Sequence, residues 1–106
     1  MIPRAIKDQI TRIAIKNNAE FALVFGSFAR NTHTKGSDID IIFIENTSLP
    51  FLQRLGRYFD DLSDSLKMGI DVFVYTPAEY ENMKDLPFLK RAITEGEVVY
   101  ESGKVL

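Results

Sequence analysis

The sequence contains no cysteine, no long apolar run and no excess of positive charge, and each absence narrows the possible functions. Without cysteine the chain cannot form disulfides, bind a metal through thiolates or use a cysteine nucleophile. No apolar run approaches the roughly 20 residues that span a bilayer, and the N-terminus lacks the apolar stretch of a secretory signal. We therefore expect a soluble protein of the cytoplasm that has no membrane partner.

The charge balance is slightly acidic, with a formal net charge of −2 and an isoelectric point of about 5.3. Domains that bind nucleic acid mainly through its phosphates are usually basic, with an isoelectric point above about 9. Charge and size therefore argue against a template-dependent polymerase and against direct nucleic-acid binding. A length of 106 residues with 45% hydrophobic residues predicts one packed domain, residues 1–106, with no linker or repeat.

Apolar periodicity predicts an alternation of helices and strands. The expected strands are residues 21–25, 38–44, 70–75 and 97–101. Helices are expected from Pro3 to about Lys16, over 27–31, from Thr76 onward, over 87–95, and along the apolar stripe Leu52, Leu55, Phe59, Leu62 and Leu66. Ser27 and Thr76 are the expected N-caps. This order predicts an α/β (α+β) fold, in which a small mixed β-sheet of three to four strands is flanked by helices.

Aspartates interrupt two of the predicted strands. Asp38 and Asp40 lie two residues apart, so their side chains point to the same face, with Cα atoms roughly 6.5–7 Å apart. Asp71 interrupts the next strand. If the two strands are neighbours, its side chain lies close to those of Asp38 and Asp40. Like charges placed together are unfavourable unless a cation compensates them. Oxygen ligands of this kind suit Mg²⁺ or Mn²⁺ bound alongside substrate phosphates.

Gly26-Ser27 follows directly on a buried strand and opens a short helical segment. Glycine lets the backbone approach an anion closely, and free N–H groups at a helix start attract phosphate. Arg30, three residues further on, can reach the same phosphates.

Each of these features also has a simpler explanation. An isolated Asp-x-Asp pair is often a loop or capping element, Gly-Ser after a strand is an ordinary turn, and Arg30 can be solvated or paired with an aspartate. A single aspartate at Asp71 can begin an exposed edge strand. Their combination in this order, each in a suitable element, favours a nucleotide site over a coincidence.

The sequence resembles the DNA polymerase β nucleotidyltransferase superfamily through Gly26-Ser27, ten intervening residues, Asp38-x-Asp40 and the later Asp71. Within it, Gly26-Ser27-Phe28-Ala29-Arg30 and Ser37-Asp38-Ile39-Asp40 look like the minimal nucleotidyltransferases, which are antitoxin-type partners of HEPN-domain proteins. The resemblance extends to the closing segment, residues 88–100. The family usually has glycine after the arginine, where this chain has Asn31. Asparagine tolerates a positive φ, so we expect the turn to be kept.

The resemblance implies an enzyme that transfers a nucleoside monophosphate, AMP from ATP, with release of pyrophosphate. Asp38 and Asp40 would bridge two Mg²⁺ ions, and Asp71 would bind the ion that activates the acceptor hydroxyl. The residues expected to position the β- and γ-phosphates are Gly26, Ser27 and Arg30. The implied acceptor is a hydroxyl of a HEPN-type partner protein. The surface that binds the acceptor would then come from this partner, in a hetero-complex, or from a second copy of the chain.

Two alternatives stay open from the residues alone. One is a binding module that neutralises its partner by contact without catalysis, although three carboxylates in strands would then serve no purpose. The other is an enzyme that modifies a small hydroxylated molecule, as the antibiotic nucleotidyltransferases do. Small size argues against it, because the nucleotide half uses most of the 106 residues.

Overall fold

The computed structural model describes residues 2–103. The helices are α1 (Arg4–Lys16), α2 (Gly26–Arg30), α3 (Phe51–Leu66), α4 (Pro77–Met83) and α5 (Pro87–Glu95), and the strands are β1 (Phe21–Phe25), β2 (Ile39–Ile44), β3 (Ile70–Tyr75) and β4 (Glu97–Glu101). Within residues 2–103, no helix is long and apolar enough to cross a membrane.

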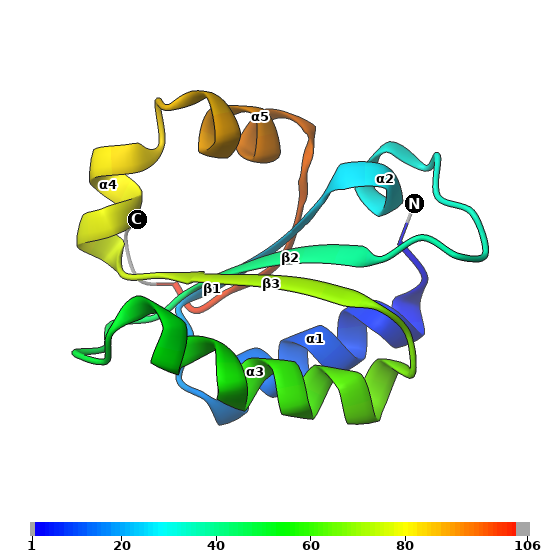
Figure 1. Ribbon diagram of the computed structural model, residues 1–106, viewed down its shortest axis with the longest axis horizontal. Coiled ribbons are helices and arrows are strands. Elements are labelled where there is room, and N and C mark those ends of the chain that lie inside the picture. Colours follow the sequence, from blue (N-terminus) through cyan, green and yellow to red (C-terminus); the bar gives the residue numbers. More distant parts are fainter. Residues whose placement is uncertain (1, 104–106) are drawn as a thin grey trace.

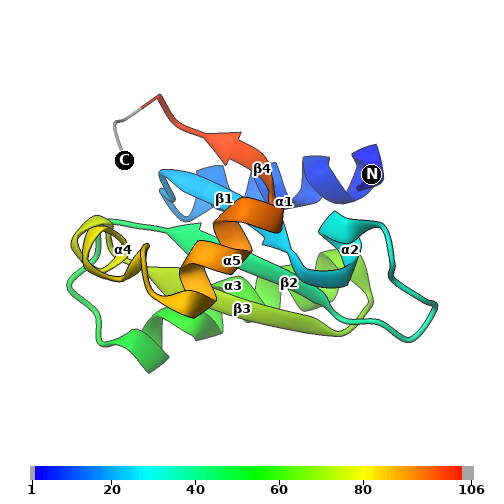
Figure 2. The ribbon, with the colours of Figure 1, turned by 90° about the horizontal axis from the view of Figure 1, so that it is seen from above.

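The four strands form one mixed sheet in the order β3-β2-β1-β4. β1 is antiparallel to both β2 and β4, whereas β2 and β3 are parallel and are joined by the crossover helix α3. α1 and α3 lie on one face of the sheet, and α2, α4 and α5 lie on the other (Figure 1). Seen from above, α5 runs across the middle of the sheet (Figure 2). The predicted fold class is confirmed.

The central strand β2 contributes to a core on each face of the sheet. Ile41 and Phe43 are fully buried in the larger core beneath α1 and α3. Ile42, between them, packs into the second core with Leu89 of α5. Because side chains alternate along a strand, Asp40 lies on the same face as Ile42, the face of α5. The period of the strand therefore decides which helices surround this carboxylate.

The buried face of α3 matches the prediction only in part, because Leu55 and Leu66 pack against the core as predicted and two other residues do not. Leu52 and Phe59, predicted to face the core, are 77% and 47% exposed. Arg54 and Tyr58 are buried in their place, and only Leu62 of the predicted stripe is fully buried. The spacing of apolar residues misled the prediction, because it gave no weight to polar side chains that find buried partners.

Arg54 is the clearest case of such a partnered polar side chain. It donates to both carboxylate oxygens of Glu79, at 2.6 and 3.0 Å, and to the backbone carbonyls of Leu49 and Val74, at 2.8 and 3.1 Å. Glu79 in turn accepts from the backbone N–H of Thr76, and the Thr76 hydroxyl caps α4 as predicted. One guanidinium thus ties α3, β3 and α4 together.

The turn after β1 also differs from the prediction. The short helix α2 begins at Gly26, and Phe25 occupies its N-cap without a side-chain hydrogen bond, so the prediction of Ser27 as N-cap is wrong. A φ of +72° at Gly26 turns the chain from strand into helix one residue earlier than expected. β2 begins at Ile39, so Asp38 immediately precedes the strand instead of opening it.

We predict that Arg54→Ala lowers the free energy of unfolding by about 3 kcal/mol, because it strips a buried ion pair of one partner and two carbonyls of their donor. The hydrogen bond from Arg54 is the main cause that lowers the pKa of Glu79. A lowered pKa means that this stability is present at neutral pH and is lost as the pH falls through the pKa of Glu79 in the folded protein. The difference between wild type and variant should therefore shrink in acid.

Urea unfolding followed by circular dichroism at neutral and acidic pH measures this effect. The exposed Arg4 provides the control, and Arg4→Ala should stay within about 0.5 kcal/mol of wild type. Equal losses in the two variants would contradict the role given to Arg54.

Candidate active site

The parallel pairing of β2 with β3 sets Asp40 directly beside Asp71. Both residues begin rows that continue, on the α5 face of the sheet, into Ile42 and Phe73 of the second core. A side-chain hydrogen bond joins the two carboxyl groups. Two carboxyl groups can share a hydrogen bond only when one of them is protonated. The fold therefore forces two acidic groups into contact at one end of the sheet.

The surroundings of Asp40 disfavour its charged form. Burial raises the pKa of Asp40 from its ordinary value of 3.8 to about 6, and the hydrogen bond and charge of Asp71 act in the same direction. The negative charge of Asp38 raises the pKa further, whereas the positive charge of Arg30 opposes the shift. All three predicted aspartates and the predicted arginine are thus close enough to influence one carboxyl group.

Two glycines leave the room that these carboxylates occupy. A Cβ atom placed on Gly26 would lie 2.2 Å from Oδ2 of Asp40, and one placed on Gly69 would lie 1.9 Å from Oδ1 of Asp38. Real Cβ atoms do not approach oxygen so closely, so any side chain at either position would displace a carboxylate. Gly26 therefore contacts the acidic cluster formed by Asp38, Asp40 and Asp71, and it also turns the chain into α2.

Contacts of its first residues, 31–33, fix the conformation of the loop that leads to Asp38. Asn31 adopts the left-handed conformation with φ 60°, as expected for the residue that replaces the usual glycine. Thr32 donates its backbone N–H to the carbonyl of Ser27 at 2.9 Å. The ring of His33 stacks on Phe28 with centroids 4.0 Å apart, and its buried Nδ1 has no hydrogen-bond partner within residues 2–103. These contacts hold the loop against α2.

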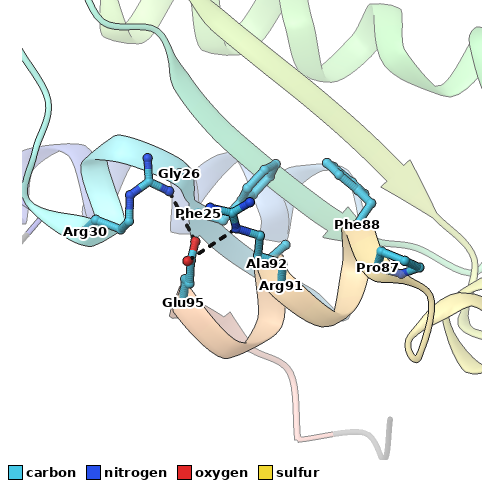
Figure 3. Close-up of a pocket in the computed structure, with 8 residues that line it drawn as sticks. All are labelled: Phe25, Gly26, Arg30, Pro87, Phe88, Arg91, Ala92 and Glu95. Atoms are coloured by element: carbon cyan, nitrogen blue, oxygen red, sulfur yellow. Dashed lines mark hydrogen bonds and ion pairs between the residues drawn. The ribbon is translucent and has the colours of Figure 1, made fainter.

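Arg30 points toward α5. Its Nη1 lies 3.2 Å from Oε2 of Glu95, and Nε of Arg91 lies 3.4 Å from the other oxygen of Glu95 (Figure 3). Neither Arg91 nor Glu95 was predicted as a site residue. Their only signal in the sequence is a pair of opposite charges four residues apart on a helix, which is typical of any solvated helix face.

The chemistry of the cluster fits a hard divalent cation. Its donors are carboxylate oxygens, and a cation between Asp40 and Asp71 would offset the repulsion that raises the pKa of Asp40. Their side chains do not yet form a ligand set, because no three Asp, Glu or His side chains among residues 2–103 are arranged to hold a metal ion. The structure brings Asp40 and Asp71 into contact and leaves Asp38 nearby.

Comparison with known families identifies the chain. Residues 8–104 match the family model described as "Polymerase beta, Nucleotidyltransferase". The chain belongs to this nucleotidyltransferase family. The match spans every candidate site residue from Gly26 to Asp71, and it confirms the resemblance found in the sequence. The protein is accordingly a nucleotidyltransferase in class.

Two relatives of this nucleotidyltransferase occur in Methanocaldococcus jannaschii. "Putative protein adenylyltransferase MJ0435" is 42% identical over 72 residues, which cover 66% of this chain and 74% of that protein. "Putative protein adenylyltransferase MJ0126" is 37% identical over 79 residues, which cover 73% of this chain and 70% of that protein.

Solved structures share the fold at low sequence identity. A toxin–antitoxin structure with AMP-PNP gives a TM-score of 0.71 at 18% identity, covering 92% of this chain and 74% of that chain. A structure of the tri-AMPylated HEPN toxin of Shewanella oneidensis in complex with MNT antitoxin contains a chain that gives a TM-score of 0.60 at 16% identity. The match covers 91% of this chain and 70% of that chain. The structure described as "a putative nucleotidyltransferase from Sulfolobus solfataricus" also gives a TM-score of 0.60, at 21% identity, covering 95% of this chain and 84% of that chain.

We predict that Asp40→Asn stabilises the metal-free protein at pH 7. Because the pKa of Asp40 is raised to about 6, the folded wild type binds more protons than the unfolded chain between pH 4 and 6 and loses stability as the pH rises through this window. Asparagine removes that loss. Solvent screening of the partly exposed group limits the gain to about 1–2 kcal/mol.

Thermal unfolding in the presence of a chelator, at several pH values, measures this gain. The variant and the wild type should converge below about pH 4, where Asp40 is protonated in both states. Asp60→Asn removes the same charge from an exposed position on α3 and should give no comparable gain. A wild type that becomes more stable from pH 4 to 6 relative to Asp40→Asn would contradict the prediction.

Gly26→Ala should destabilise the fold by about 2 kcal/mol, because it combines the strain of a positive φ with a collision against Asp40. Gly36→Ala is the matched control, since a Cβ at Gly36 meets nothing within 4 Å. Urea unfolding of both variants tests the difference. Equal stability of the two would show that the backbone at Gly26 adapts freely.

Proposed function

We propose that this nucleotidyltransferase transfers AMP from ATP to a hydroxyl of a partner protein, as an antitoxin that modifies a HEPN-type toxin. The observation that carries the proposal is the contact of Asp40 with Asp71 beside Gly26, at the end of two paired strands. The family supports the reaction class, and the names of the two archaeal relatives support a protein acceptor. The structural likeness to toxin–antitoxin complexes supports the choice of partner.

The carboxylates of Asp38, Asp40 and Asp71 would hold two Mg²⁺ ions, and Mn²⁺ fits the same donors. Such ions supply positive charge that stabilises the reacting phosphate and the departing pyrophosphate. Positive charge held there would lower the pKa of Asp40, because it would compensate the nearby negative charges of Asp71 and Asp38.

In the transfer, the acceptor oxygen bonds to the α-phosphorus, the bond from this phosphorus to the bridging oxygen breaks, and pyrophosphate leaves. Asp71 accepts the proton of the acceptor hydroxyl. Its side chain is exposed, so an acceptor on another protein can reach it. The groups that hold the β- and γ-phosphates are Gly26, Ser27 and Arg30.

A second candidate is neutralisation by contact alone. Leu52 and Phe59 are exposed apolar side chains of α3, and α3 covers the face of the sheet opposite α5 (Figure 1). Such a surface suits a protein partner whose binding does not depend on the carboxylates. Both candidates therefore predict a complex, and they differ in whether the carboxylates are needed for neutralisation.

We predict that the doubly substituted Asp38→Asn, Asp40→Asn protein binds its HEPN partner and no longer modifies it. The test incubates purified protein and partner with ATP and Mg²⁺, then measures complex formation by co-purification and AMP addition by intact-mass spectrometry. Wild type should add AMP to the partner, and the variant should add less than about 1% as much, because an acidic cluster that holds its cations acts as a unit.

The matched control is Glu81→Gln, Asp85→Asn, which removes two charges from exposed positions beyond the site and should retain transfer. If the Asp38→Asn, Asp40→Asn variant forms the complex and still silences the toxin, contact is sufficient and the second candidate holds. Full transfer by that variant would refute the catalytic assignment of the aspartates.

A further inference from the structure

A cavity of about 380 Å³ lies between α2 and α5, beside the acidic cluster. Phe25, Pro87, Phe88 and Ala92 supply its apolar lining, and Gly26 lines the side that faces Asp40. The charged lining residues are Arg30, Arg91 and Glu95 (Figure 3). A ligand held at the aspartates would therefore reach this cavity by passing Gly26.

Inside the cavity, Glu95 is shared between two arginines. One carboxylate oxygen pairs with Arg30 at 3.2 Å and the other with Arg91 at 3.4 Å. Among the charged residues that line the cavity, two positive charges thus face one negative charge. The side chains of Arg30 and Arg91 are 43% and 74% exposed, and ion pairs so accessible to water are weak. A stronger anion can displace Glu95 at little cost.

We propose that Arg91, together with Arg30, binds the terminal phosphate of the nucleoside triphosphate in this cavity, and that Glu95 occupies its place until the nucleotide arrives. The proposal rests on the transfer reaction proposed above, because it places the α-phosphate at the aspartates. From there the triphosphate chain extends past Gly26 toward the two guanidinium groups. Guanidinium matches phosphate geometry with paired hydrogen bonds, and a phosphate carries more negative charge than a carboxylate.

This arrangement gives the enzyme a means to distinguish a triphosphate from shorter nucleotides. Only a nucleotide long enough to reach Arg91 releases that arginine from Glu95. AMP would leave the Glu95 pairs in place. Arg91 would accordingly act as a binding residue for the far end of ATP, several bonds away from the reacting phosphorus, and Glu95 would act as its competitor.

Titration calorimetry with ATP, ADP and AMP in Mg²⁺ tests the proposal, using the intact protein without its partner. Arg91→Gln should weaken ATP binding about tenfold, by loss of charge-assisted hydrogen bonds, and leave AMP binding within about twofold. Glu95→Gln should tighten ATP binding about two- to fivefold, by removing the competing carboxylate. Lys90→Gln, an equal loss of charge from the neighbouring position on α5, should change neither ligand.

Three results would overturn the proposal while leaving the transfer reaction intact. Unchanged ATP affinity in Arg91→Gln would remove Arg91 from the site. An equal loss for AMP and ATP would place the base or ribose in the cavity instead of the terminal phosphate. Weaker ATP binding in Glu95→Gln would make Glu95 a support for the arginines and not a competitor. If wild-type protein binds no ATP at all, the proposed transfer fails together with this inference.

Discussion

The parallel register of β2 against β3 is the constraint on which the candidate site depends. It sets Asp40 opposite Asp71, so folding brings together two groups that repel each other when both are charged. A slip of one residue in either strand would turn its aspartate to the opposite face, into the core beneath α1 and α3. The register is fixed by that core, because β2 and β3 bury Ile41, Phe43 and Val74 on the same face.

The remaining structure holds this unfavourable cluster in place. β2 has apolar, fully buried neighbours on both faces, so it cannot rotate to relieve the contact of its carboxylate. The hydrogen bonds of Arg54 to the carbonyl of Val74 and of Tyr58 to Glu45 tie α3 to the sheet at the other end of the strands. These two contacts thus lie away from the carboxylates of Asp40 and Asp71. Under the proposed function, a bound cation would compensate the repulsion among the carboxylates.

Gly26 is important both for recognising the family and for the geometry of the candidate site. In the sequence, Gly26 belongs to the motif by which the nucleotidyltransferase resemblance is found. In the structure it has a positive φ, it contacts Asp40, and it lines the cavity that holds Arg30 and Arg91. Gly26 therefore adjoins both the acidic cluster and the cavity between α2 and α5 that contains the two arginines. A nucleotide with acidic phosphates and bound cations needs both environments side by side.

The sequence by itself determined the features that depend on neighbouring residues. Short apolar runs predicted all four strands, and Thr76 followed by a proline predicted the cap of α4. It also predicted that Asn31 would accept a positive φ. These properties follow from backbone geometry and from side-chain preference within a few residues, so no knowledge of the remaining chain was needed.

The tertiary structure alone decided which distant groups meet. The ion pair of Arg30 with Glu95 spans 65 residues and the pair of Arg54 with Glu79 spans 25, and neither is encoded in a local pattern. The buried face of α3 was partly mispredicted for this reason, since hydrophobic spacing overlooks an arginine whose partner lies on another element. Whether a charge is solvated, paired or placed in a cavity is settled by the packing of elements far apart in sequence, and here that packing set Arg91 and Glu95 beside Gly26.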